Sequence, residues 1–210
     1  MSTGGMDHAL WYLSRATGVV ALLVLSLTVV LGVVIGKRGR VRGLPRGAGV
    51  GLHRNASLFA VTLVTCHVLS AVLDPYVAIG WIAVVVPFSS SYEPLWLGLG
   101  ALALDLAIAL VVTSLLRFRL GIATWRAVHW LAYLAWPIAV VHGIGAAVDL
   151  RSGVLLVVVL AMVTTVVGAV GWRVGALSAP RPAARPRAAV PDRGVSPHSA
   201  LEVSSSARIR

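Results

Sequence analysis

The sequence has few of the residues on which many soluble proteins depend. It holds a single cysteine, Cys66, among 210 residues, so neither an intrachain disulfide nor a cysteine-rich metal site can form within the chain. Charged residues make up only 12% of the chain, and Asp and Glu together number 7. A soluble domain usually carries about 25% charged residues, so the composition is unlike that of a soluble domain.

Long apolar runs take the place of these residues. The chain is 58% hydrophobic, with a mean hydropathy of +0.90. Several runs reach the ~20 apolar residues that a helix needs to cross a bilayer, and they are too long and continuous for barrel strands. The runs therefore predict an all-α integral membrane protein, a bundle of five transmembrane helices. The expected spans are about 10–35, 50–73, 94–116, 126–147 and 153–175.

Three segments lie outside these spans. Residues 1–9 form a short N-terminal segment. Segment 74–93 has an apolar part of about a dozen residues, too short to cross a bilayer, and it is interrupted by Pro87. We expect it to lie at the interface or to re-enter the membrane. Residues 176–210 are rich in Pro, Ala, Ser and Arg, a composition typical of a disordered tail.

The net charge of +11 is concentrated in the connecting segments. With five alternating spans, loops 36–49 and 117–126 share one side with the tail, and all three are rich in arginine. The positive-inside rule then predicts an outer N-terminus and a cytoplasmic C-terminus. We interpret the charge as a topology signal and expect contact with membrane lipid, not with nucleic acid. Arginine outnumbers lysine seventeen to one, which is typical of a GC-rich bacterial genome and favours a bacterial inner-membrane protein.

Four histidines lie at matched depths in two spans that run in the same direction. His53 and His67 are fourteen residues apart in the second span, ~21 Å of helix, and His129 and His142 are thirteen apart in the fourth, ~20 Å. Imidazole is a good axial ligand of haem iron, which takes one ligand from each side. Two parallel helices with imidazoles at two levels predict two stacked bis-histidine haems, with His53 and His129 near the cytoplasmic face.

The spacing of thirteen residues does not by itself keep both histidines on one helix face. At 100° per residue, fourteen residues return within about 40° of the starting face, but thirteen miss it by about 140°. Pro137 lies between His129 and His142, and proline distorts a helix locally. We therefore expect local overwinding or a kink in the fourth span.

Two other interpretations remain open. The histidines and Asp105 of the third span could form the relay of a non-haem metal or proton transporter, because ionisable residues within a span are often functional. The chain could instead be a structural subunit that anchors a larger complex, with histidines that only pair with polar groups in the bundle. Neither interpretation requires four histidines at matched depths.

At these residues the sequence resembles the ferric reductase-like transmembrane domain. This family is shared by ferric reductases, the NADPH oxidase membrane domain and bacterial haem-binding quinone-linked subunits. The resemblance covers about residues 10–150, and the fourteen-then-thirteen histidine spacing is typical of the family. By resemblance, His53 and His129 bind an inner b-type haem, and His67 and His142 bind an outer one. The similar stretches are LSRATGVVALL at 13–23, LHRNASLFAVTLVTCH at 52–67, VVTSLLRFRLG at 111–121 and WRAVHWLAYLAWPIAVVHG at 125–143.

Two departures from the family pattern shape the expected function. About 35 residues follow the last span, without a G-x-G-x-x-G strand–turn–helix unit, so we expect no FAD or NAD(P) domain in this chain. The donor would be a separate flavoprotein, flavodoxin-like carrier or quinol, and the acceptor an outer-face small molecule or protein. Oxidase members resemble one another in a further histidine one turn beyond the outer ligand; here that position is Ala71, so we do not expect superoxide production.

Three arginines could bind haem propionates, and one aspartate lies within a span. Arg15, near the outer end of the first span, matches an arginine of the family and could pair with an outer haem propionate or shape an acceptor site; it could also snorkel to the interface. Arg54 and Arg126 could hold inner propionates by charge-assisted hydrogen bonds, or act only as positive-inside anchors. Asp105 could be protonated and bonded within the bundle, or help to move protons. We assign no residue a catalytic role, and whether the chain is itself an enzyme stays open.

Overall fold

The computed structural model describes residues 3–38, 47–75, 77 and 79–178. This part of the chain is helical throughout its regular elements and contains no strand, which confirms the expected all-α fold. The elements are α1 (Thr3–Arg38), α2 (Ala48–Leu73), α3 (Trp81–Val85), α4 (Pro94–Leu115), α5 (Arg117–Leu120), α6 (Ile122–His129), α7 (Ala132–Ala146), the 3₁₀ helix η1 (Val148–Arg151) and α8 (Gly153–Ser178).

Five segments are long and apolar enough to cross a membrane, as the sequence predicted: His8–Gly36, Ala48–Leu73, Pro94–Leu115, Ile122–Ala146 and Gly153–Gly175. Helix α1 already begins at Thr3, within the segment expected to precede the first span, and α8 continues three residues beyond the expected end at 175. The expected disordered tail, from 179 onward, and most of the first basic loop lie outside the described residues.

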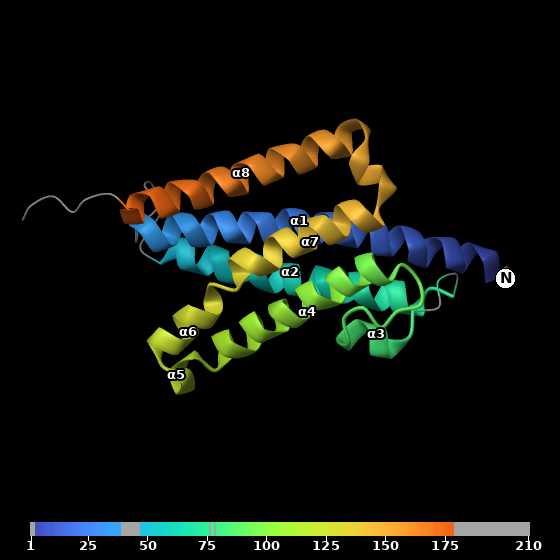
Figure 1. Cartoon of the computed structure of the whole chain (residues 1–210), viewed down its shortest axis with the longest axis horizontal. Coiled ribbons are helices and arrows are strands. Elements are labelled where there is room, and N and C mark those ends of the chain that lie inside the picture. The colour runs from blue at the N-terminus through green and yellow to red at the C-terminus, as the bar shows by residue number, and fades with distance from the viewer. Residues whose placement is uncertain (1–2, 39–46, 76, 78, 179–210) are drawn as a thin grey trace, which may run out of the picture. The chain divides into compact units, whose positions relative to one another are not determined.

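The long helices pack in two pairs. Helix α1 lies along α2, α4 lies along α7, and α1 also contacts α7 (Figure 1). Helix α8 adds Val159 and Met162 to a buried apolar cluster with Leu22, Val140 and Leu150. We call the end where α1 begins the N-terminal end. The opposite end, where α5 and α6 carry arginines, we call the basic end (Figure 1).

The fourth span is not one regular helix, because α6 ends at His129 and α7 begins at Ala132. Around this junction the backbone N–H groups of Leu131, Tyr133 and Leu134 each bond to the carbonyl three residues earlier, at 2.9, 3.0 and 3.0 Å. Such 3₁₀ winding turns about 20° more per residue than an α-helix, so about five residues recover roughly 100° of the missing 140°. The expected overwinding is present, and it lies before Pro137 in the chain.

Segment 74–93 contains only the short helix α3. Phe88, which follows α3, has a positive φ of 66°, and its ring lies against Gly98 of α4, where a larger residue would collide with it. This contact holds the segment against the start of α4 at the N-terminal end. Its expected interfacial or re-entrant placement stays a prediction.

Candidate functional site

The four span histidines meet in two pairs between α2 and the fourth span. The ring centroids of His53 and His129 are 6.4 Å apart, with an angle of 74° between the ring planes. Those of His67 and His142 are 6.2 Å apart, at 70°. The residues predicted to face one another at two depths are therefore brought together, one pair toward each end of the bundle.

At the N-terminal end, each histidine is held by a backbone carbonyl of a neighbouring helix. His67 Nδ1 lies 2.8 Å from the Ser14 carbonyl of α1, and His142 Nδ1 lies 2.7 Å from the Trp96 carbonyl of α4. A carbonyl oxygen can only accept, so in each ring Nδ1 carries the proton and donates it. The Nε2 lone pair of each ring is then free to bind a metal, which is the usual arrangement of a ligating histidine.

At the basic end, only one of the two histidines has such a bond. His53 Nδ1 donates to the Thr28 carbonyl of α1 at 3.0 Å. His129 Nδ1 is buried and has no hydrogen-bond partner among the residues that the structure describes. The His129 ring instead stacks on Trp125 one turn earlier, with centroids 5.0 Å apart and 27° between the planes.

Each of the three carbonyls that accept an imidazole proton is accessible to the histidine because a glycine lies beside it. Gly18, Gly32 and Gly100 lie four residues after Ser14, Thr28 and Trp96, directly above the carbonyls that accept the imidazole protons. A Cβ on these glycines would lie 2.9 Å from the His67 ring, 3.4 Å from that of His53 and 2.7 Å from that of His142. Each glycine therefore provides the space that its histidine ring occupies against the helix.

The two pairs have the spacing of imidazoles on opposite sides of one metal ion. Two metal–imidazole bonds of about 2 Å, with about 1.1 Å from each nitrogen to its ring centre, place the centroids roughly 6.2 Å apart. Among the described residues, no three His, Cys, Asp or Glu side chains gather at a site that could hold a metal ion. The donor sets are thus pairs, which suit the two axial positions of a haem iron.

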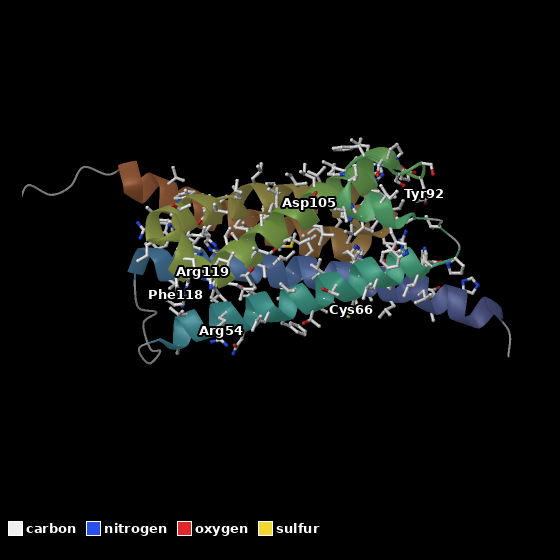
Figure 2. The ribbon with its side chains drawn as sticks, turned by 90° about the horizontal axis from the view of Figure 1, so that it is seen from below. Arg54, Cys66, Tyr92, Asp105, Phe118 and Arg119 are labelled. Carbon is white, nitrogen blue, oxygen red and sulfur yellow. The ribbon has the colours of Figure 1, made fainter. Side chains whose placement is uncertain are left out.

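The predicted cations lie in different settings. The Arg15 guanidinium forms an ion pair with Asp149 of η1 and lies 4.3 Å from the centre of the Trp11 ring. Arg54 and Arg126 are exposed, and Figure 2 shows the Arg54 side chain pointing away from the helices. The propionate roles expected for these three arginines stay predictions.

Two further residues from the sequence analysis lie apart from the pairs. Asp105 is partly buried in the middle of α4 and makes no hydrogen bond or ion pair with another described residue (Figure 2). Cys66 precedes His67, but its side chain is exposed on α2. Cys66 is therefore not a third ligand beside the histidine.

Sequence reasoning missed the glycines and the stacked Trp125. A signal for the first was present, because Gly18 and Gly32 are fourteen residues apart, as are His53 and His67 on the adjacent helix. Because α1 and α2 are antiparallel, these equal spacings place Gly18 beside His67 and Gly32 beside His53. It also missed Arg173 of α8, whose guanidinium Cζ lies 5.4 Å from the centre of the Trp130 ring, next to His129.

The sequence of the chain matches a known family of membrane proteins. No curated protein and no solved structure matches this chain. The family model described as "Ferric reductase like transmembrane component" matches residues 17–140, more than half of the sequence; this region holds His53, His67 and His129 and ends two residues before His142. The chain is a multi-pass membrane protein that belongs to the ferric reductase-like transmembrane family.

Proposed function

We propose that the protein is a di-haem b-type cytochrome that moves electrons across the membrane. Membership of the family supports a role in membrane electron transfer. The observation that carries the proposal is the pairing of His53 with His129 and of His67 with His142, at centroid distances of 6.4 and 6.2 Å. These four histidines would be the axial ligands, and each haem, when bound, supplies an iron that accepts and releases one electron.

The chain's own task is to hold the imidazoles at two levels. The glycines that accommodate His67 and His53 are fourteen residues apart on α1, ~21 Å of helix, within a hydrocarbon core ~30 Å thick. Between these levels, Trp136 Nε1 donates to the buried Ser26 hydroxyl at 2.8 Å. This bond joins α7 to α1 and satisfies both the Trp136 indole N–H and the Ser26 hydroxyl between the two levels.

The direction of transfer follows from the expected topology. With the basic end in the cytoplasm of a bacterial cell, electrons would enter at His53 and His129 from a separate flavoprotein, flavodoxin-like carrier or quinol. They would leave at His67 and His142 for an outer acceptor, near the side chains of Arg15 and segment 74–93. The chain would serve as the membrane subunit of an oxidoreductase.

Proteoliposomes test this function. The purified full-length chain, loaded with haem, is reconstituted into vesicles that enclose a reductant, with ferricyanide outside as an impermeant acceptor. We expect ferricyanide reduction that requires haem and falls to the level of empty vesicles in His53→Ala and His142→Ala. Absence of electron transfer, together with metal or proton flux that depends on Asp105, would favour the transporter instead.

A further inference from the structure

Arg173 of α8 is half-buried and directs its positive charge at α1 and the fourth span. Its guanidinium lies against Gly36 of α1, where even a Cβ would collide with it, and its Cζ lies 5.4 Å from the centre of the Trp130 ring. Its Nε is buried and has no hydrogen-bond partner among the described residues. An arginine near the end of a span usually extends to the aqueous interface, whereas this one is directed at the neighbouring helices.

The described carboxylates lie far from Arg173 along the helices. Asp74 ends α2, Glu93 precedes α4, and Asp149 pairs with Arg15, all at the N-terminal end. Asp105 lies in the middle of α4. The described part of the basic end therefore supplies no anion for Arg173. A charge within a span is costly without a partner, so an anion from another source would stabilise it.

Arg173 is next to the His53–His129 pair. Trp130, which it covers, directly follows His129 in the chain. Gly36, which it touches, lies one helical turn beyond Gly32, the residue that accommodates the His53 ring. The guanidinium is thus about one turn from this pair, on the side of the basic end.

We propose that Arg173 binds a carboxylate of the haem held by His53 and His129, a role that rests on the proposed function. A haem carries two propionates, and a guanidinium binds a carboxylate by charge-assisted, often bidentate, hydrogen bonds. A lipid phosphate offers the same anionic chemistry, but it would approach from the bilayer, whereas Arg173 is directed at α1 and Trp130. Arg54 and Arg126, by contrast, are exposed.

The test compares haemin with haemin dimethyl ester, which has the same macrocycle but no free carboxylates. Full-length chain carrying His67→Ala, which leaves only the basic-end pair, is freed of haem and titrated with each compound by visible absorbance. We expect the chain to prefer haemin, Arg173→Gln to weaken haemin binding by about tenfold, and the ester to bind equally with or without Arg173. Arg173→Lys, which keeps the charge, should keep most of the preference and guards against a folding defect. Arg119→Gln, an exposed arginine at the same end, should change neither titration.

Other results would overturn the inference. Equal weakening of haemin and ester by Arg173→Gln would mean that the residue supports the fold and binds no carboxylate. Unchanged haemin binding, with less phospholipid retained per chain, would assign Arg173 to a lipid headgroup. If the chain with all four histidines and Arg173 bound neither compound, the proposed function itself would fail, which is a different result from a loss confined to the variant.

Discussion

The two ends of the bundle hold the same pair of side chains in different ways. At the N-terminal end both imidazoles donate Nδ1 protons to carbonyls, so both rings are oriented by neighbouring helices. At the basic end only His53 has such a bond, while His129 rests on Trp125. The basic end differs also in its backbone, because the chain leaves α-helical geometry directly after His129, at the junction of α6 and α7.

The arginines at the two ends also differ, in whether a carboxylate of the protein pairs with them. Arg15 at the N-terminal end already has a partner in Asp149, whereas Arg173 at the basic end has no described anionic partner. If the two pairs are the proposed haem sites, the basic-end site should depend more than the N-terminal one on the group that it binds. This contrast teaches that equal ligand sets do not imply equally preorganised sites.

The largest effect on haem binding is expected at the N-terminal end, where His67 and His142 are both oriented by hydrogen bonds to carbonyls. Gly100→Ala would place a Cβ 2.7 Å from the His142 ring and displace it from the Trp96 carbonyl. We expect haem per chain to fall from two towards one, with the basic-end haem retained. Gly168→Ala in α8 is the matched control, because a Cβ there meets nothing within 4 Å. Full haem content in Gly100→Ala would show that the close packing at this glycine is not needed.

A smaller effect is expected from the stack at the basic end. Trp125→Leu removes the ring that supports His129, and such an aromatic contact contributes roughly 1 kcal/mol. Haem affinity at the basic end should fall several-fold, while the N-terminal site is unchanged; haem titrations in the His67→Ala and His53→Ala backgrounds separate the two. Equal weakening at both sites would contradict the proposed independence of the two ends.

Gly32→Ala should have a milder effect than Gly100→Ala. Its Cβ would lie 3.4 Å from the His53 ring, a tight contact that a shift of a few tenths of an ångström relieves. We expect both haems to remain and the midpoint potential of the basic-end haem to shift slightly, as measured by redox titration. Complete loss of that haem would mean that the basic end is as rigidly built as the other.

The smallest effect is expected from the ion pair. The side chains of Arg15 and Asp149 are 31% and 61% exposed, so Asp149→Asn should cost less than about 1 kcal/mol of stability. Haem content should stay at two per chain, and the thermal midpoint in detergent should move only slightly. Loss of the N-terminal haem in this variant would show that Arg15 must be held in place for that haem to bind.

Much of this arrangement could be predicted from the sequence. Five apolar runs gave the number of spans, because the length of a membrane-crossing helix is set by the bilayer. The fourteen- and thirteen-residue spacings matched His53 with His129 and His67 with His142 in depth. The thirteen-residue spacing also required overwinding of the fourth span, which is found at residues 130–134.

The contacts around the histidines could not be predicted in the same way. A backbone carbonyl such as that of Thr28 has no side-chain signature, and whether Gly32 faces a histidine depends on how α1 is rotated against α2. The inward direction of Arg173 likewise depends on the rotation of α8, since arginines near span ends most often extend outward. Spacing fixes depth along a helix, but packing against the neighbours fixes rotation.

The central claim is that the two histidine pairs are two haem sites. The most direct test is a dithionite-reduced minus oxidised spectrum of the purified full-length chain, with haem counted per chain, beside the same measurement on His67→Ala. Our account predicts two b-type haems in the unaltered chain and one in His67→Ala. No haem in chain produced with ample haem supply, or a count that His67→Ala leaves unchanged, would contradict it.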